Sequence, residues 1–196
     1  MNNFNSVRFN RVIKITDVVI KVFKIFFMVL FALTVLAIAI IALMPSDLFV
    51  VGGEGIRIGI SLHPVIIDSS ELVITESLKP LILSALFLGL MYLPFTYLVF
   101  RLIGLVIQKT KEKVPFDSMA ITHLFKLSYV FLVGGLVLPL INLIALAVIR
   151  SNYAGINFSL EYSPHMNMMF TGVLVYILAN IFEYGGYLQS EVDATV

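Results

Sequence analysis

The chain has 196 residues, of which 60% are hydrophobic and 13% are charged, and its mean hydropathy is +1.02. A soluble domain of this length carries about a quarter charged residues, so the composition excludes an ordinary soluble domain and indicates lipid as a second apolar solvent. Cysteine is absent, which excludes disulfides, thiolate metal sites and a cysteine nucleophile.

The N-terminal segment, residues 1–24, has the pattern of an amphipathic helix. Its charged side chains recur at steps of three and four residues, opposite Val, Ile and Phe. Asp17 and Lys21 stand at i, i+4 and are expected to pair weakly. The pattern predicts a helix lying in the inner membrane interface, with a cytoplasmic extension of the first span as the alternative.

Four uncharged stretches predict four transmembrane helices. They cover residues 25–44, 81–100, 127–149 and 166–182. At 1.5 Å per residue, about 20 residues cross the hydrocarbon layer of about 30 Å. The first stretch is longer than the apolar region of a secretory signal peptide, so we expect it to be a signal-anchor helix.

The connections after the first and third spans are predicted to form an external β cap. Residues 56–62 and 156–162 alternate apolar and polar side chains, and residues 71–76 supply a further candidate strand. Three short alternating segments on one side of the membrane predict one antiparallel sheet over the helix ends. The predicted fold is therefore a four-helix transmembrane bundle with an extracytoplasmic antiparallel β cap.

Basic residues predict the orientation in the membrane. Residues 1–24 and 101–126 carry ten Lys or Arg, whereas the two outer connections carry three, so both termini are expected in the cytoplasm. Six acidic residues fall on each side, which gives the outer side a net charge of −3 and the inner side +4. Lipid headgroups are the nearest anions, so we expect no direct nucleic-acid binding by the membrane-interface residues Arg8, Arg11, Lys14, Lys21, Lys24, Lys109, Lys111 and Lys113.

In chain order we assign an interfacial helix (residues 1–24), a first span (25–44), an outer β-rich segment (45–79) and a second span with an inner extension (80–108). There follow an inner basic turn (109–117), a third span with an inner extension (118–149), an outer β-like segment (150–165), a fourth span (166–184) and an acidic tail (185–196).

Polar and helix-breaking residues within the spans are few. Pro94 and Pro139 are expected to kink the second and third helices. Asn142 is the most polar side chain deep in a span, and it either bonds to a neighbouring backbone group or lines a path or pocket. No span carries a mid-membrane acidic or basic residue, which disfavours proton- or cation-coupled transport.

No catalytic or metal-binding motif is evident in the sequence. The three histidines do not form H-E-x-x-H, and neither G-x-S-x-G nor a Walker motif occurs. A site built from His63, His165, Glu161 and Asp68 would require the two outer segments to pack together; otherwise these are ordinary loop residues. We therefore expect no catalytic residue, no metal and no cofactor.

The C-terminal segment differs in character from the spans. Glu183 marks the exit of the fourth helix from the membrane, and Gly185-Gly186 are expected to break or bend it. The acidic residues that follow are expected to fold back onto the basic inner turn or to dock a soluble partner, with a frayed terminus as the alternative.

Two segments resemble a known family. Residues 113–135, "KVPFDSMAITHLFKLSYVFLVGG", and 181–196, "IFEYGGYLQSEVDATV", are similar to DUF2975, a family of small four-span bacterial membrane proteins of unknown function. The matching positions are Pro115-Phe116, Phe182, Gly185-Gly186, Leu188-Gln189, Glu191, Asp193 and Thr195-Val196, whereas the aromatic "EYGGY" departs from the basic turn expected there. The resemblance implies no catalytic residues and a partnership with a small helix-turn-helix regulator.

These observations predict a non-enzymatic integral protein of the bacterial plasma membrane that acts by protein–protein contact, in regulation, sensing or immunity. The candidate docking residues are Pro115, Phe116, Glu183, Leu188, Gln189, Glu191 and Asp193. The alternative is a small transporter that oligomerises to build a path near Pro94, Pro139 and Asn142, and a membrane enzyme ranks third. Self-association is left open by the sequence.

Overall fold

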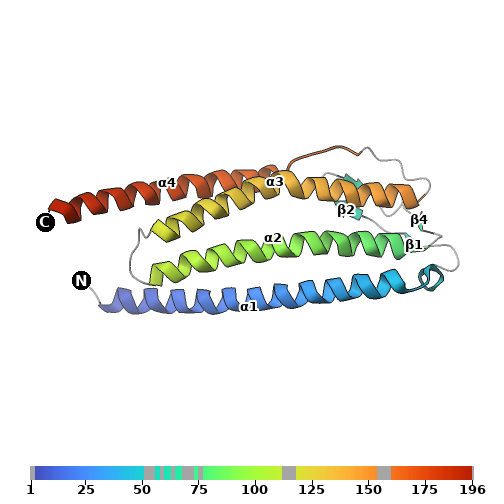
Figure 1. Cartoon of the computed structure of the whole chain (residues 1–196), viewed down its shortest axis with the longest axis horizontal. Coiled ribbons are helices and arrows are strands. Elements are labelled where there is room, and N and C mark those ends of the chain that lie inside the picture. The colour runs from blue at the N-terminus through green and yellow to red at the C-terminus, as the bar shows by residue number, and fades with distance from the viewer. Residues whose placement is uncertain are drawn as a thin grey trace. The chain divides into compact units, whose positions relative to one another are not determined.

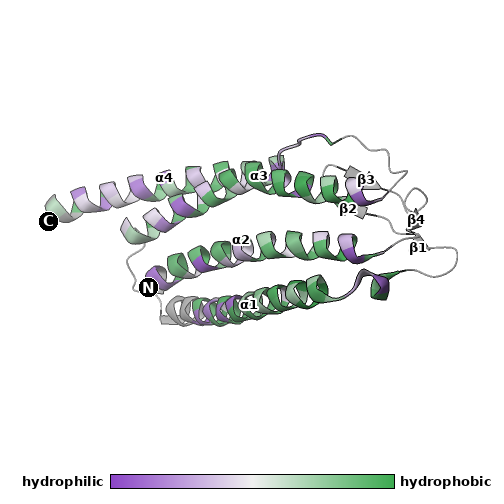
Figure 2. Ribbon diagram, turned by 45° about the vertical axis from the view of Figure 1, so that its right-hand side comes forward, coloured by the Kyte–Doolittle hydropathy of each residue, from purple (hydrophilic) through white to green (hydrophobic). Residues whose placement is uncertain are grey.

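The computed structural model describes residues 3–50, 56–57, 60–62, 65–67, 73–74, 77–111, 118–153 and 160–195. Four long helices dominate: α1 (Asn3–Leu43), α2 (Lys79–Lys111), α3 (Ser118–Asn152) and α4 (Met166–Thr195) (Figure 1). Each contains a stretch that is long and apolar enough to cross a membrane, coloured green in Figure 2. The four predicted membrane-length helices are therefore confirmed, and the fold is that of a multi-pass membrane protein.

The first helix is longer than a single span. α1 continues without interruption from the amphipathic N-terminal segment into the apolar stretch, which is the extension that the sequence offered as its alternative. Neither Gly nor Pro occurs within α1, so nothing in the chain ends the helix at the predicted junction near residue 24. Asp17 and Lys21 form the predicted ion pair, with Oδ2 and Nζ 3.2 Å apart.

The last helix also exceeds its predicted length. α4 passes through Gly185 and Gly186 and ends at Thr195, so the expected break at the glycine pair is wrong. A glycine within a helix costs about 1 kcal/mol relative to alanine, which is too little to end a helix that continues on both sides. The Tyr187 hydroxyl donates to Oε1 of Glu191 at 2.6 Å, one turn later, and supports the last turns.

The chain divides into two compact units. Unit 1 comprises Met1–Met28, Phe95–Gly135 and Met166–Val196, and therefore holds both ends of the chain. Unit 2 comprises Val29–Pro94 and Leu136–His165, and therefore holds the connections that follow α1 and α3.

In unit 1, aromatic side chains and glycines bring the helices together. Phe23 of α1 stacks on Phe100 of α2 with ring centroids 5.0 Å apart. Tyr176 of α4 meets Phe125 of α3 edge to face at 5.4 Å. Gly172 lies so close to α3 that an added Cβ would be within 3.1 Å of three atoms of a single leucine. Small residues of this kind let helix backbones approach closely in membranes.

In unit 2, one lysine completes the end of α1. The ammonium group of Lys79, the first residue of α2, donates to the carbonyl oxygens of Ala42 at 3.1 Å and Met44 at 2.6 Å. The last carbonyls of a helix lack intrahelical partners and carry partial negative charge, so a cation is well matched to this position. The short 3-10 helix η1 (Ser46–Phe49) follows.

A tyrosine ties the end of α3 to the start of α2. The hydroxyl of Tyr153 donates to the carbonyl of Ser77 at 2.9 Å and accepts from the backbone N–H of Leu81 at 3.3 Å. Tyr153 is buried, so its hydroxyl requires partners, and both are backbone groups at the start of α2.

The predicted external β cap is not supported. β1 (Ile56–Arg57) pairs with β4 (Val73–Ile74), and β2 (Ile60–Leu62) pairs with β3 (Val65–Ile67), in two separate antiparallel ladders. All four short strands come from the connection between α1 and α2. The described part of the other connection, residues 160–165, contains no strand, so the described residues do not form one sheet from both connections.

Candidate functional site

Three polar side chains meet in unit 2, and we call them the polar cluster. The hydroxyl of Tyr92, on α2, donates to Oδ1 of Asn142, on α3, at 3.0 Å. The same hydroxyl lies 3.4 Å from Nε2 of His165, the residue directly before α4. Asn142 is 3% exposed, whereas Tyr92 and His165 are half-buried. Asn142 thus bonds to a side chain of a neighbouring helix, a common way for polar residues to join helices in membranes.

Prolines flank the polar cluster on both helices. Pro94 follows Tyr92 by two residues and Pro139 precedes Asn142 by three, and α2 and α3 continue through them. Pro139 has no N–H for the carbonyl four residues earlier, which loosens this turn of α3. The next carbonyl, that of Leu136, accepts a hydrogen bond from the hydroxyl of Tyr162 at 3.0 Å. The connection before α4 therefore supplies a donor where a proline disturbs α3.

The non-helical residues 160–165 lie alongside α3 and not beyond its end. The Tyr162 hydroxyl bonds to the carbonyl of Leu136, and His165 lies beside the same Tyr92 hydroxyl as Asn142. In Figure 1 the trace that leads into α4 runs alongside α3. The sequence predicted this segment as a β-like element outside the membrane; its described part forms no strand, and α4 begins at Met166, where the fourth span was predicted to begin.

The depth of the polar cluster follows from the helices that carry it. Asn142 stands seven residues before Ile149, the end of its uncharged stretch, which is about 10 Å at 1.5 Å per residue. Tyr92 stands eleven residues after Leu81, the start of its stretch, which is about 17 Å. The polar cluster therefore lies well inside the apolar part of these two helices.

The structure regroups the residues named from the sequence. A site of His165 with His63, Glu161 and Asp68 was one alternative from the sequence and ordinary loop residues the other; His63 and Asp68 are outside the described residues, and His165 lies next to the hydroxyl of Tyr92. Glu161 is exposed and belongs to the same non-helical segment as His165. Among the described residues, no group of three or more acidic or histidine side chains is arranged to hold a metal ion.

Sequence reasoning missed the two tyrosines that organise this region. Tyr92 could have been identified from the sequence, because it lies within an apolar stretch and a buried hydroxyl needs a hydrogen-bond partner. Tyr162 gave no such signal, because its role depends on where residues 160–165 lie in the fold.

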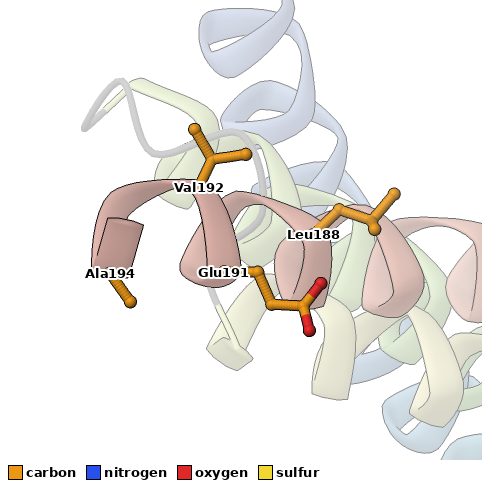
Figure 3. Close-up of a pocket in the computed structure, with 4 residues that line it drawn as sticks. All are labelled: Leu188, Glu191, Val192 and Ala194. Atoms are coloured by element: carbon orange, nitrogen blue, oxygen red, sulfur yellow. The ribbon is translucent and has the colours of Figure 1, made fainter. Parts of the chain in front are cut away.

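A second candidate site is an exposed apolar stripe at the end of α4. Tyr184, Leu188 and Val192 stand four residues apart and are 64%, 42% and 61% exposed. Leu188 and Val192 project from the same side of the helix and, with Glu191 and Ala194, line an open depression (Figure 3). We call Tyr184, Leu188 and Val192 the tail stripe.

The tail stripe extends past the neighbouring helix. Gly172 of α4 packs against Leu132 of α3, and the two helices run antiparallel, as the pair Tyr176–Phe125 also shows. α3 begins fourteen residues before Leu132, so the same distance along α4 ends at residue 186. Residues 187–195 therefore project beyond the start of α3.

The remaining predicted docking residues are placed as follows. Glu183, Gln189 and Glu191 are exposed on α4, and Asp193 lies in the helix with its side chain outside the description. Pro115 and Phe116 lie outside the described residues. The hydrogen bond to Glu191 raises the pKa of the Tyr187 phenol above its ordinary value, because ionisation would remove the donor and place two negative charges together.

The predicted interface basic residues lie in unit 1. Lys24 is half-buried, and its ammonium group lies 3.0 Å from the position of a Cβ added to Gly104 of α2. The end of the Lys24 side chain therefore reaches from α1 to α2 within unit 1. Arg11, Lys14 and Lys21 are exposed on α1, and Lys109 is half-buried on α2. The side chains of Arg8 and Lys111 and the whole of Lys113 are outside the description.

The fold and these sites define a multi-pass membrane protein with a polar cluster between its helices and a projecting C-terminal helix. Comparisons of the chain with models of protein families, with characterised proteins and with solved structures find no match. The resemblance to DUF2975 gains no support from them and stays a prediction.

Proposed function

We propose that this is a non-enzymatic protein of the bacterial plasma membrane that acts by contact with another protein, in regulation, sensing or immunity. The observation that carries the proposal is the tail stripe on a helix that projects beyond its neighbour. Apolar side chains at four-residue spacing are the feature with which an amphipathic helix docks into a partner's groove.

The orientation in this proposal places both termini in the cytoplasm. Ten of the thirteen Lys and Arg residues belong to residues 1–24 and 101–126, and basic residues favour the cytoplasmic side. Unit 1 contains most of these residues together with both ends of the chain, which supports a common side for them. The tail stripe would then meet soluble cytoplasmic proteins.

The charge of the C-terminal segment indicates the kind of protein that could bind it. Residues 183–196 contain Glu183, Glu191 and Asp193 but no Lys or Arg. A groove rimmed by basic residues would complement this segment and would exclude acidic competitors. The partner is therefore a soluble protein with an apolar groove and a basic rim. The small helix-turn-helix regulator implied by the resemblance would be one such partner, with this chain making no direct contact with nucleic acid.

The test is a comparative pull-down after crosslinking in native membranes. The full-length protein should capture a specific protein that is lost when the chain ends at Tyr184, and lost as well from the double variant Leu188→Ala with Val192→Ala. The control, Ser190→Ala, changes a neighbouring exposed position outside the tail stripe and the predicted docking residues, and should retain the partner. Equal capture by the double variant and by the control would refute docking through the tail stripe.

A second candidate function, a small oligomeric transporter, is favoured by a separate observation. Buried Asn142 lies on α3, whose backbone bonding Pro139 loosens, and bonds to α2, which contains Pro94. Loosened helices around polar groups are typical of transporter binding sites. Asn142→Leu should abolish the activity of a transporter and leave partner capture unchanged. Deletion of the tail after Tyr184 should do the reverse.

A further inference from the structure

We infer that residues 160–165 border a water-filled crevice that admits small hydrophilic solutes, cations more readily than anions, from the outer side to His165. The crevice is formed by residues 160–165 and the facing parts of α2 and α3 in unit 2. It rests on the membrane orientation proposed above and is independent of docking through the tail stripe.

The first step of the argument is the position of a non-helical backbone. Residues 160–165 run beside α3 to the polar cluster, and Asn142 lies about 10 Å along α3 from the end of the uncharged stretch. Non-helical backbone at membrane depth is tolerated only where protein covers it or where it lines an aqueous cavity, because lipid offers no hydrogen bonds.

The second step is the exposure of this segment. Leu160 is 40% exposed, Tyr162 is 44% exposed, and Glu161 between them is exposed as well. The described part of the chain therefore does not cover them. An ionised carboxylate in contact with lipid is costly, whereas water in front of the segment would solvate both Glu161 and the peptide groups. Water is thus the occupant that the charge of Glu161 favours over lipid.

The third step is the chemistry of the two ends of the crevice. Glu161 lies toward the mouth, and the floor is formed by a phenol, an amide and an imidazole that exchange hydrogen bonds. The other charged residues of unit 2 whose side chains are described are Asp47, Lys79 and Arg150, and the ammonium group of Lys79 donates to the carbonyls of Ala42 and Met44.

The electrostatic balance favours cations at the mouth. The outer connections carry a net charge of −3, which raises the local concentration of small cations. The N-terminus of α4, next to His165, contributes only about half a positive charge at the floor. The net potential at the entrance is therefore negative.

The absence of cysteine from the chain allows a direct test with thiol reagents. Ser163→Cys and His165→Cys would be exposed, in intact cells, to two membrane-impermeant methanethiosulfonates, one with a trimethylammonium group and one with a sulfonate. Leu140→Cys is the matched control, because Leu140 is two residues from Asn142 but is 48% exposed on the outside of α3. Ser46→Cys and Ser190→Cys report the outer and inner surfaces.

We expect Ser163→Cys to react within about ten-fold of the rate of Ser46→Cys, and Leu140→Cys about a hundred-fold more slowly, because a thiol facing lipid does not ionise. The cationic reagent should react about five-fold faster than the anionic one at Ser163→Cys, and Glu161→Gln should reduce this ratio toward one. His165→Cys gives a second reading in case Ser163→Cys is poorly expressed.

Three results would count against the inference or its premise. If Ser163→Cys and His165→Cys are as slow as Leu140→Cys while Ser46→Cys reacts, the segment is covered by lipid or by a second copy and the crevice is refuted. If the two reagents react equally with Ser163→Cys, the preference for cations is refuted. If Ser190→Cys reacts in intact cells and Ser46→Cys does not, the proposed orientation is wrong. The reaction rates of Ser163→Cys, His165→Cys and Leu140→Cys would then be compared in inverted vesicles to test whether the crevice exists.

Discussion

The close contact between α3 and α4 can be tested with a single methyl group. A Cβ added at Gly172 would lie 2.8 Å from Cγ and 3.0 Å from the backbone nitrogen of Leu132. A Cβ at Gly89, on α2, would meet only Cγ2 of Thr34 at 3.8 Å, which is ordinary van der Waals contact. Gly89→Ala is therefore a matched control that adds the same methyl group to a helix without a clash.

The two substitutions should have opposite effects on the free energy of unfolding. Replacing a helical glycine by alanine gains up to about 1 kcal/mol of helix propensity, which Gly89→Ala should show in full. Overpacking costs about 1–3 kcal/mol, and a backbone nitrogen at the clash leaves little room for relaxation, so Gly172→Ala should lose about 1–2 kcal/mol net. The difference of about 2–3 kcal/mol corresponds to about 4–12 °C in Tm for a chain of this size.

Thermal unfolding in mild detergent, followed by circular dichroism and by loss of the monodisperse species, would measure this difference. A Tm for Gly172→Ala equal to or above that of Gly89→Ala would refute the close approach of α4 to Leu132. Only the contact between Tyr176 and Phe125 would then define the register of α4 against α3. The projection of residues 187–195 beyond α3, which is counted from Leu132, would no longer be supported.

Three further predictions concern hydrogen bonds of the described residues. Tyr92→Phe and Asn142→Leu should have coupled effects on the free energy of unfolding. The double variant should be about 0.5–1.5 kcal/mol more stable than the sum of the two single effects predicts, and strict additivity would refute the bond between the two side chains. Lys79→Met should lower the free energy of unfolding by about 1 kcal/mol because two carbonyls at the end of α1 lose their donor, and an unchanged Tm would contradict this contact. The phenol pKa of Tyr187, followed by ultraviolet absorbance, should fall toward its ordinary value in Glu191→Gln, and no change would show that the hydrogen bond does not persist in solution.

The membrane-length helices were predictable because a single property, the absence of charge over about 20 residues, decides them. Their ends were not, because a membrane boundary does not end a helix. α1 contains no breaker, so it extends from its polar N-terminal turns into the apolar stretch. At Gly185 and Gly186 the cost of two glycines was smaller than the gain of continued helical hydrogen bonding, and the composition of the segment alone could not show that balance.

The candidate site was predictable only in part. Asn142 was singled out from the sequence as the most polar side chain deep in a span, and in the structure it is buried and bonded to Tyr92. Its partner Tyr92 and the nearby His165 are 50 and 23 residues away in sequence, and only tertiary packing joins them. Of the alternating segment 156–162 only residues 160–162 are described, and they form no strand. Period two indicates which side chains share a face but not where the segment lies in the fold.

The proposed docking and the inferred crevice become one mechanism through α4. The residue before this helix, His165, belongs to the polar cluster, and the last turns carry the tail stripe, so one uninterrupted helix of 30 residues, about 45 Å, links the two. Had Gly185-Gly186 broken the helix, a change at His165 would have ended at a hinge. A solute that displaces the Tyr92 hydroxyl from His165 would instead act on the first turn of a continuous element that also presents the stripe. Such coupling requires that α4 has two arrangements, and that both the solute and the partner distinguish them. A role in sensing therefore predicts that His165→Ala alters the dependence of partner capture on external solutes, while a purely structural tail would capture its partner equally with and without this substitution.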